Sequence, residues 1–184
     1  MNASVISPQP STGFCTDDDR AGERSVSRNP LIILTRRASW RTLVQADSDM
    51  LDLVAHVDGG SLGNPGPAGI GVVIDGPRDE RITIAKWIGC QDNNVAEYVA
   101  LLEALQHALA LKAESLHVYS DSEVIVKQMR GEYTCRSPRL HSLNWICRKL
   151  ARSLKFSISH IRRENNAEAN RLANLAVRKQ LASA

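Results

Sequence analysis

Residues 53 to 66 read Leu53-Val54-Ala55-His56-Val57-Asp58-Gly59-Gly60-Ser61-Leu62-Gly63-Asn64-Pro65-Gly66. Side chains alternate in character from Leu53 to Asp58, which is the period of a half-buried β-strand. Four glycines and a proline follow Asp58, and glycine lets a backbone approach a ligand closely because it has no Cβ. A carboxylate at a strand end beside such a loop suits a metal ion held against a phosphate-bearing substrate. The alternative for this stretch alone is a tight hairpin with a solvated Asp58.

The hydrophobic pattern predicts an ordered domain over residues 50–184. Strands over 68–74 and 81–89 follow the first strand after short connections, so the three should form an antiparallel meander. A helix over 95–112 is apolar nearly all round and should be buried. The remaining pattern predicts strands over 116–120 and 156–161 and helices over 123–129, 138–154 and 166–181.

Residues 1–49 differ from the rest of the chain. They are rich in Ser, Pro, Arg and Asp and lack a sustained period, so we expect a mostly disordered extension. The net charge of +3 is compatible with a nucleic-acid partner. No apolar run approaches the ~20 residues that span a membrane, so no membrane partner is expected. The four cysteines, Cys15, Cys90, Cys135 and Cys147, form no C-x-x-C pair and are interpreted as free thiols of a cytoplasmic protein.

Two further carboxylates stand at positions like that of Asp58. Glu97 lies in the first turn of the apolar helix, where the helix dipole favours a negative charge, but a buried carboxylate needs a partner. Asp121 ends the fourth predicted strand, or else caps the helix that follows it. If the three carboxylates converge, they repel one another, and the usual relief is a divalent cation that prefers oxygen ligands, Mg²⁺ or Mn²⁺.

Four motifs in order resemble type 1 ribonuclease H over about residues 51 to 180. They are the 58–66 loop, Asn93-Asn94-Val95-Ala96-Glu97-Tyr98, Tyr119-Ser120-Asp121-Ser122 and His160-Ile161-Arg162-Arg163-Glu164-Asn165-Asn166-Ala167-Glu168-Ala169-Asn170. The connection from Gly131 to Ser137 leaves no room for the basic protrusion of longer members, so the short prokaryotic branch is the nearest. The resemblance implies an α/β ribonuclease H-like fold: a five-stranded mixed sheet, three strands antiparallel and then two parallel, flanked by helices.

The resemblance also implies an activity and its residues. The family cuts the RNA strand of RNA–DNA hybrids with two metal ions, Mg²⁺ or Mn²⁺ as a substitute, and leaves a 5′-phosphate and a 3′-hydroxyl. Asp58, Glu97, Asp121 and Asn170 would hold the metals, and His160 would assist proton transfer or product release. Other residues of the motifs would contact the hybrid, and a monomer is expected; these residues are Gly59, Gly60, Ser61, Asn64, Asn93, Asn94 and Asn166. Asn93 and Asn94 could instead cap the helix.

Two positions depart from the family pattern. Asn170 stands where the family has a fourth carboxylate, and its amide brings an oxygen without a negative charge. Asp92 stands where the family has a threonine that binds phosphate, and a carboxylate would repel a phosphate. Phosphate contacts could come from Arg136 and Arg139 or from Arg162 and Arg163, which could equally be a solvated basic face.

Three functions fit these residues. The first is an active hybrid-specific endonuclease, possessing the activity that the resemblance implies. The second is a binding module of the same fold that grips hybrid or double-stranded RNA but cuts poorly, because Asn170 and Asp92 weaken its site. The third is another metal nuclease of the same fold, such as an integrase-like or resolvase-like enzyme, since a fold does not determine a function. The Asn93–Asn94 pair and the glycine loop favour the first over the third.

Overall fold

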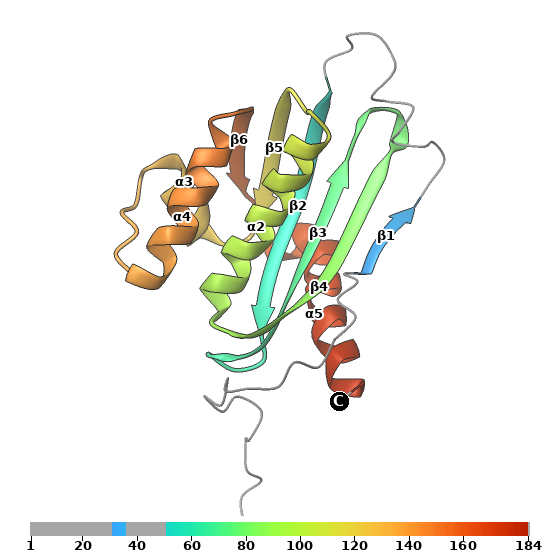
Figure 1. Cartoon of the computed structure of the whole chain (residues 1–184), viewed down its shortest axis with the longest axis vertical. Coiled ribbons are helices and arrows are strands. Elements are labelled where there is room, and N and C mark those ends of the chain that lie inside the picture. The colour runs from blue at the N-terminus through green and yellow to red at the C-terminus, as the bar shows by residue number, and fades with distance from the viewer. Residues whose placement is uncertain (1–30, 36–50, 184) are drawn as a thin grey trace, which may run out of the picture.

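The computed structural model describes residues 31–35 and 51–183, with strands and helices labelled in Figure 1. The strands are β1 (Leu31–Thr35), β2 (Asp52–Ser61), β3 (Gly66–Asp75), β4 (Arg81–Gln91), β5 (Ser115–Ser120) and β6 (Lys155–His160). The helices are α2 (Asn93–Ala110), α3 (Glu123–Arg130), α4 (Pro138–Ala151) and α5 (Ala167–Ala182), with short 3₁₀ turns η1 (Pro77–Asp79) and η2 (Arg163–Asn166). Each element that the sequence predicts is present, with ends shifted by up to three residues.

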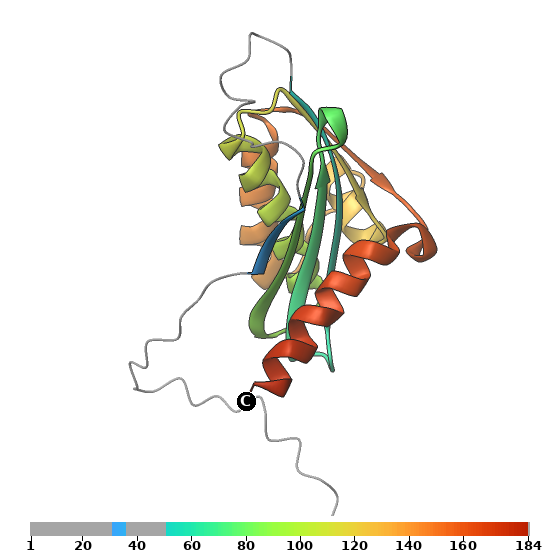
Figure 2. The same ribbon diagram turned by 90° about the vertical axis from the view of Figure 1, so that its right-hand side faces the viewer.

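The strands form one mixed sheet in the order β1-β4-β3-β2-β5-β6. β2 pairs antiparallel with β3, and β3 antiparallel with β4, whereas β2–β5 and β5–β6 are parallel. The predicted sheet of three antiparallel and two parallel strands is therefore confirmed. Figure 2 shows α2 and α4 on one face of the sheet and α5 on the other.

Strand β1 was not predicted. It pairs antiparallel with β4, from Leu31 opposite Ala85 to Thr35 opposite Arg81, and adds a sixth strand at the edge. Its five residues fall within the segment 1–49 that we expected to be mostly disordered. The rest of that expectation lies outside the described residues. A five-residue run without a clear alternating pattern gives little signal, because its strand structure depends on the partner β4.

The main core lies between the sheet and helix α2. Side chains of β2, β3 and β5 meet the buried face of α2, and Leu101, Leu105 and Tyr98 are among the largest fully buried side chains. The prediction that this helix is buried is confirmed. The Tyr98 hydroxyl donates to Gln128 of α3 at 2.6 Å and accepts from Asn144 of α4 at 2.9 Å. This buried network ties three helices together at one hydroxyl group.

One cysteine is not the free thiol that was expected. Cys135 and Cys147 are free, as expected. Cys90, near the end of β4, is disulfide-bonded. A disulfide requires two Cα atoms about 4.4–6.8 Å apart, and the spacing of cysteines along a sequence does not reveal such a distance.

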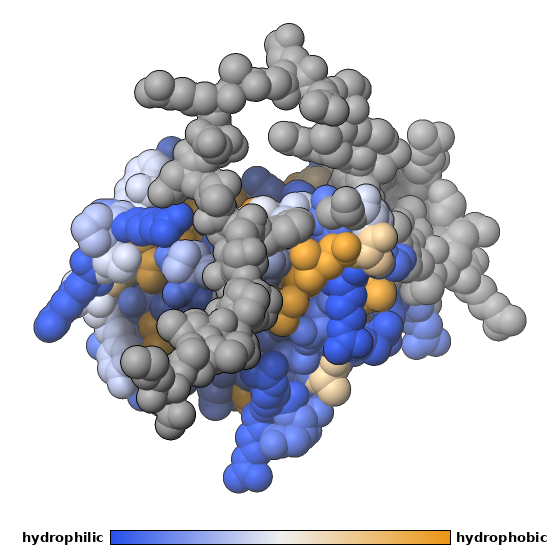
Figure 3. Space-filling model, turned by 90° about the horizontal axis from the view of Figure 1, so that it is seen from below, coloured by the Kyte–Doolittle hydropathy of each residue, from blue (hydrophilic) through white to orange (hydrophobic). Residues whose placement is uncertain are grey.

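The surface at one end of the molecule is mainly hydrophilic. Figure 3 views the end that carries the β2–β3 turn, and its described residues show limited apolar areas among polar ones. Large apolar side chains are exposed at separated places, including Leu62 in that turn and Trp145 on α4. Within the described parts of the chain, no helix combines the length and apolar character needed to cross a membrane.

Helix α5 lies directly on strand β3 at Gly71. A Cβ at this position would lie 2.0 Å from the Ala169 carbonyl oxygen and 2.7 Å from the Ala173 nitrogen. Both neighbours are helix backbone, which cannot move aside alone. Glycine at position 71 therefore sets how closely α5, the helix that carries Asn170, approaches the sheet.

We predict that Gly71→Ala destabilises the fold by about 1–3 kcal/mol, because the added methyl forces α5 away from β3. The matched control is Gly60→Ala, since a Cβ at position 60 has no heavy atom within 4 Å. Urea unfolding of both variants measures the difference. Equal midpoints would contradict the close packing of α5 at Gly71.

Candidate metal centre

Three carboxylates from three elements converge at one place. Asp58 lies in β2, Glu97 in the second turn of α2, and Asp121 directly after β5. One oxygen of each lies within 4.8 Å of an oxygen of each of the others. The convergence that the sequence suggested is therefore present in the structure.

Glycine at position 59 makes this convergence possible. A Cβ on Gly59 would lie 2.1 Å from the Ala96 carbonyl carbon and 2.3 Å from the Glu97 nitrogen. The backbone of α2 thus rests on β2 at the residue after Asp58, and the Gly59 N–H donates to the Glu97 carboxylate. Gly59 was predicted to contact substrate. It also lets the backbone of α2 pack directly on β2, a role that was not predicted from the sequence.

Burial and mutual repulsion raise the pKa values of the two inner carboxylates. Asp58 is 4% exposed and Glu97 is 7% exposed. Burial, and then the neighbouring Asp121, raise the pKa of Asp58 to about 7. Burial, followed by Asp58 and Asp121, raises the pKa of Glu97 well above its usual value. The positive charge of Arg163 lowers the pKa of both groups and only partly offsets these effects.

The donor set fits a divalent cation. Oxygen-only ligands at close range suit Mg²⁺ or Mn²⁺. Glu97 Oε2 is buried and has no hydrogen-bond partner among the described residues. A buried carboxylate oxygen without a partner is costly, and a cation among the three carboxylates would satisfy it and relieve the repulsion between them.

Asn170 borders the cluster from the first turns of α5. Its Nδ2 lies 3.4 Å from Asp58 Oδ2, and this contact lowers the pKa of Asp58. Its Oδ1 accepts a hydrogen bond from Asn174 at 3.0 Å. Asn174, one helical turn further on, was not predicted to belong to the site, although the i,i+4 spacing on a helix could have indicated it.

Asn166 has a different place from the substrate contact that was predicted. It is 1% exposed, and its Nδ2 donates to the Val57 carbonyl and to Asp121 Oδ1, both at 2.9 Å. It therefore holds the strand before Asp58, the Asp121 carboxylate and the start of α5 together. His160 is exposed at the edge of the site, with Nε2 3.2 Å from the Asp121 main-chain oxygen.

The start of α2 is stabilised from the β2–β3 turn. Asn64 Oδ1 accepts from the Asn93 N–H at 3.1 Å, so Asn64 supplies the cap that was considered as an alternative role for Asn93 and Asn94. Asp92 precedes the helix but makes no capping bond; its carboxylate pairs with Arg139 of α4 at 2.9 Å. Asn93 and Asn94 are exposed beside this ion pair.

Gly60 and Ser61, the last two residues of β2, are half-buried. A Cβ on Gly60 would meet nothing within 4 Å, and Ser61 Oγ donates to the Gly63 carbonyl at 2.6 Å. Their predicted contact with substrate stays a prediction.

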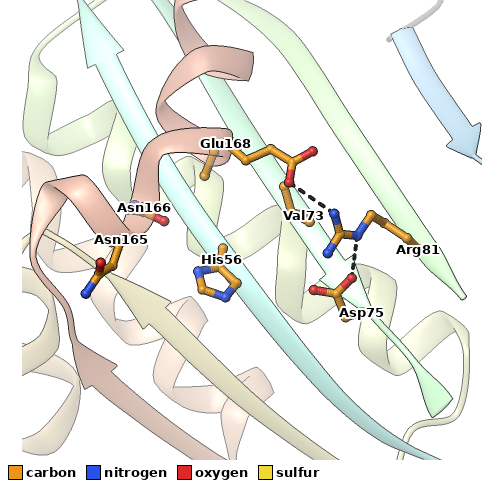
Figure 4. Close-up of a pocket in the computed structure, with 8 residues that line it drawn as sticks. His56, Val73, Asp75, Arg81, Asn165, Asn166 and Glu168 are labelled. Carbon is orange, nitrogen blue, oxygen red and sulfur yellow. Dashed lines mark hydrogen bonds and ion pairs between the residues drawn. The ribbon is translucent and has the colours of Figure 1, made fainter. Parts of the chain in front are cut away.

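A pocket of about 160 Å³ lies beside the carboxylates, between the sheet and the start of α5. Figure 4 shows His56 in this pocket, with Asn166 on one side and the Arg81 guanidinium on the other. Arg81 bridges Asp75 at 2.6 Å and Glu168 at 3.1 Å. The acids of the pocket are thus already paired, and Asn166 forms the wall between the pocket and Asp121.

Comparison with known proteins points to one family. Residues 56–176 match a family model described as reverse transcriptase-like, and the matched region contains Asp58, Glu97, Asp121 and Asn170. Ribonuclease HI of Halobacterium salinarum is 35% identical over 125 residues, which cover 67% of this chain and 63% of the relative. The chain belongs to the type 1 ribonuclease H family.

Solved ribonuclease H structures share the fold. RNase H1 of Halobacterium salinarum superimposes with a TM-score of 0.66 at 33% identity, covering 70% of this chain and 98% of the neighbour. LC11-RNase H1 in complex with an RNA/DNA hybrid gives a TM-score of 0.65 at 37% identity, covering 71% and 99%. The bifunctional protein Rv2228c of Mycobacterium tuberculosis is 37% identical over 131 residues. This chain spans only 36% of that relative's length.

The raised pKa of Asp58 predicts how stability depends on pH. Between its ordinary value of 3.8 and about 7, folded Asp58 keeps a proton that the unfolded chain releases. The contribution of Asp58 to the unfolding free energy of the metal-free chain should therefore fall as pH rises through that range. Asp58→Asn should remove this slope and raise the unfolding free energy at pH 8 by on the order of 1–3 kcal/mol.

Urea unfolding at pH 4, 6 and 8 in EDTA measures this effect. The gain from Asp58→Asn should be smallest at pH 4, where Asp58 is protonated in the folded state and partly protonated in the unfolded state. The same gain at all three pH values would show that Asp58 is not held with a raised pKa.

Proposed function

We propose that this chain is a metal-dependent endonuclease that hydrolyses the RNA strand of RNA–DNA hybrids. The observation that carries the proposal is the convergence of the buried Asp58 and Glu97 with the half-buried Asp121 within 4.8 Å. Membership of the ribonuclease H family and the likeness to an RNase H1 solved with an RNA/DNA hybrid support the choice of substrate. The proposal includes Mg²⁺ as the working ion, Mn²⁺ as a substitute, and a monomeric cytoplasmic protein.

The residues of the site have separate tasks in this reaction. Asp58, Glu97 and Asp121 would hold the cation, and Asn166 orients Asp121 through its 2.9 Å hydrogen bond. A bound divalent cation supplies positive charge against the negative charge that gathers at the reacting phosphate. Water adds to phosphorus, the bond to the 3′ oxygen breaks, and a proton passes to that oxygen. The products carry a 5′-phosphate and a 3′-hydroxyl.

His160 is placed to move protons at the edge of the site. Its ring is exposed, and Nε2 lies 3.2 Å from the main-chain oxygen of Asp121. An imidazole ring can accept a proton at one nitrogen and donate one from the other, and the exposed ring of His160 lies between the site and solvent. We therefore assign proton transfer or product release to His160.

Recognition of the hybrid would come from the turn between β2 and β3 and the start of α2. Asn93 and Asn94 are exposed there, and amide side chains can bond the 2′-hydroxyls that distinguish RNA from DNA. Asn64 holds this edge in place because it caps α2. Gly60 and Ser61 end β2 directly before this turn. Exposed Arg162 and Arg163 follow β6 and would supply positive charge for phosphates.

The second candidate is a binding module of the same fold with weak cleavage. Two observations favour it: Asn170 presents its nitrogen to Asp58, and Arg139 is paired with Asp92. Asn170 therefore brings no negative charge to the site and turns a nitrogen, not an oxygen, toward it. The second occupies an arginine that could otherwise bind a phosphate.

A cleavage assay distinguishes these two functions. With Mg²⁺, the labelled RNA strand of a hybrid should be cut, while matched DNA and RNA duplexes should stay intact.

Asp58→Asn and Glu97→Gln should each lower the cleavage rate at least about 100-fold, because each removes a ligand charge. Glu132→Gln is the matched control, since Glu132 is an exposed acid that pairs with Arg130 instead, and it should cleave like the unaltered chain. Tight hybrid binding without cleavage at any Mg²⁺ concentration would favour the binding module.

Asn170→Asp should raise the cleavage rate. The substitution adds a fourth negative charge to the cluster, so the cation binds more tightly at low concentration. We expect at least a ~10-fold gain at about 1 mM Mg²⁺, equivalent to ~1.4 kcal/mol of transition-state stabilisation. Mn²⁺ should partly rescue the unaltered chain, and hybrid affinity should change little because phosphate and sugar contacts dominate it. A titration of both proteins with Mg²⁺ is the measurement, and equal rates throughout would show that Asn170 is already sufficient.

A further inference from the structure

The amide of Asn170 has a hydrogen-bond partner at each end. Its Nδ2 lies 3.4 Å from Asp58 Oδ2, and its Oδ1 accepts from Asn174 Nδ2 at 3.0 Å. Asn174 Nδ2 also donates to the main-chain oxygen of Asn170 at 2.8 Å. The side-chain oxygen that could serve as a metal ligand is therefore already bound by Asn174.

The network determines which way the amide points. The main-chain oxygen of Asn170 can only accept, so the Asn174 atom beside it must be the NH₂ nitrogen. The same NH₂ group faces the Asn170 side chain, so the Asn170 atom next to it must be Oδ1. Turning the Asn170 amide would set NH₂ against NH₂ at one end and oxygen against carboxylate at the other. The first contact would be repulsive, and the second would be repulsive whenever Asp58 is ionised.

We propose that Asn174 is a positioning residue that keeps the NH₂ group of Asn170 toward Asp58, so that the fourth position donates a hydrogen bond instead of offering an oxygen to a cation. The inference rests on the metal dependence in the proposed function and deepens it. Asp58, Glu97 and Asp121 then hold one divalent cation, and the second ion that the family resemblance implies has lost its ligand. The hydrogen bond from Asn170 gives the Asp58 carboxylate part of the stabilisation that a second cation would supply.

Asn174→Asp reverses the hydrogen bonding with a minimal change of shape. A carboxylate at position 174 cannot donate to Asn170 Oδ1, but it accepts from Asn170 Nδ2. The Asn170 amide should then turn and present Oδ1 toward Asp58, where a cation can use it. The added negative charge also attracts cations, so the same substitution in an Asn170→Ala background measures the effect of charge alone.

Isothermal titration calorimetry of the full chain with MnCl₂, without nucleic acid, tests the proposal. The unaltered chain should bind one ion. Asn174→Asp should bind a second ion at least about tenfold more tightly than the unaltered chain, and Asn170→Ala should abolish most of that gain. Two ions of similar affinity in the unaltered chain would overturn the proposal, and so would an equal gain from Asn174→Asp with Ala at position 170.

Three points keep the test independent of a variant that fails to fold. Asn174 is exposed on α5, circular dichroism checks that each variant folds, and the ion count of the unaltered chain needs no variant at all. Hybrid cleavage is measured in parallel. One bound ion and the expected variant effects without hybrid cleavage would reject the proposed function alone, whereas cleavage by a chain that binds two ions would reject the inference alone.

Discussion

The contact between helix α2 and strand β2 at Gly59 is the constraint on which the rest of the site depends. Any side chain at position 59 would overlap the α2 backbone, since even a Cβ would lie 2.1 Å from the Ala96 carbonyl carbon. The close approach brings Glu97 beside Asp58 and gives the Glu97 carboxylate a main-chain N–H. It also lets the apolar face of α2 pack against β2, β3 and β5, where Leu101 and Leu105 are fully buried. Core packing and site geometry therefore share one contact.

The electrostatic problem of the site follows from that packing. Asp58 and Glu97 are buried next to each other and next to Asp121, and their pKa values are raised as a result. The chain offers amides as neutral partners: Asn166 donates to Asp121 and Asn170 approaches Asp58. Arg163 adds a positive charge nearby. These groups reduce the repulsion without removing it, and Glu97 Oε2 still lacks a partner among the described residues. The arrangement is strained in a way that a cation would relieve, as expected for a binding site.

The edge that would meet nucleic acid is held by polar contacts between distant segments. Asn64 of the β2–β3 turn caps α2, and Asp92 at the start of α2 pairs with Arg139 of α4. Asn93 and Asn94 are exposed between these two contacts. A rigid edge reduces the ordering cost of binding, so contacts that hold this edge would also favour binding of a nucleic acid there.

The sequence was sufficient for the order of the elements, because the periods of β2 to β6 and of the four helices are local properties. It was also sufficient to single out Asp58, Glu97 and Asp121, since each is an acid at the end of an apolar segment. It did not reveal strand β1, which depends on a partner strand far away in the chain, or the bonded state of Cys90. Nor did it reveal the burial of Asn166 or the direction of the Asn170 amide. A motif names the residue type at a position, but the role of an amide depends on which neighbour faces its oxygen and which its nitrogen, and packing between β2, β5 and α5 determines those neighbours.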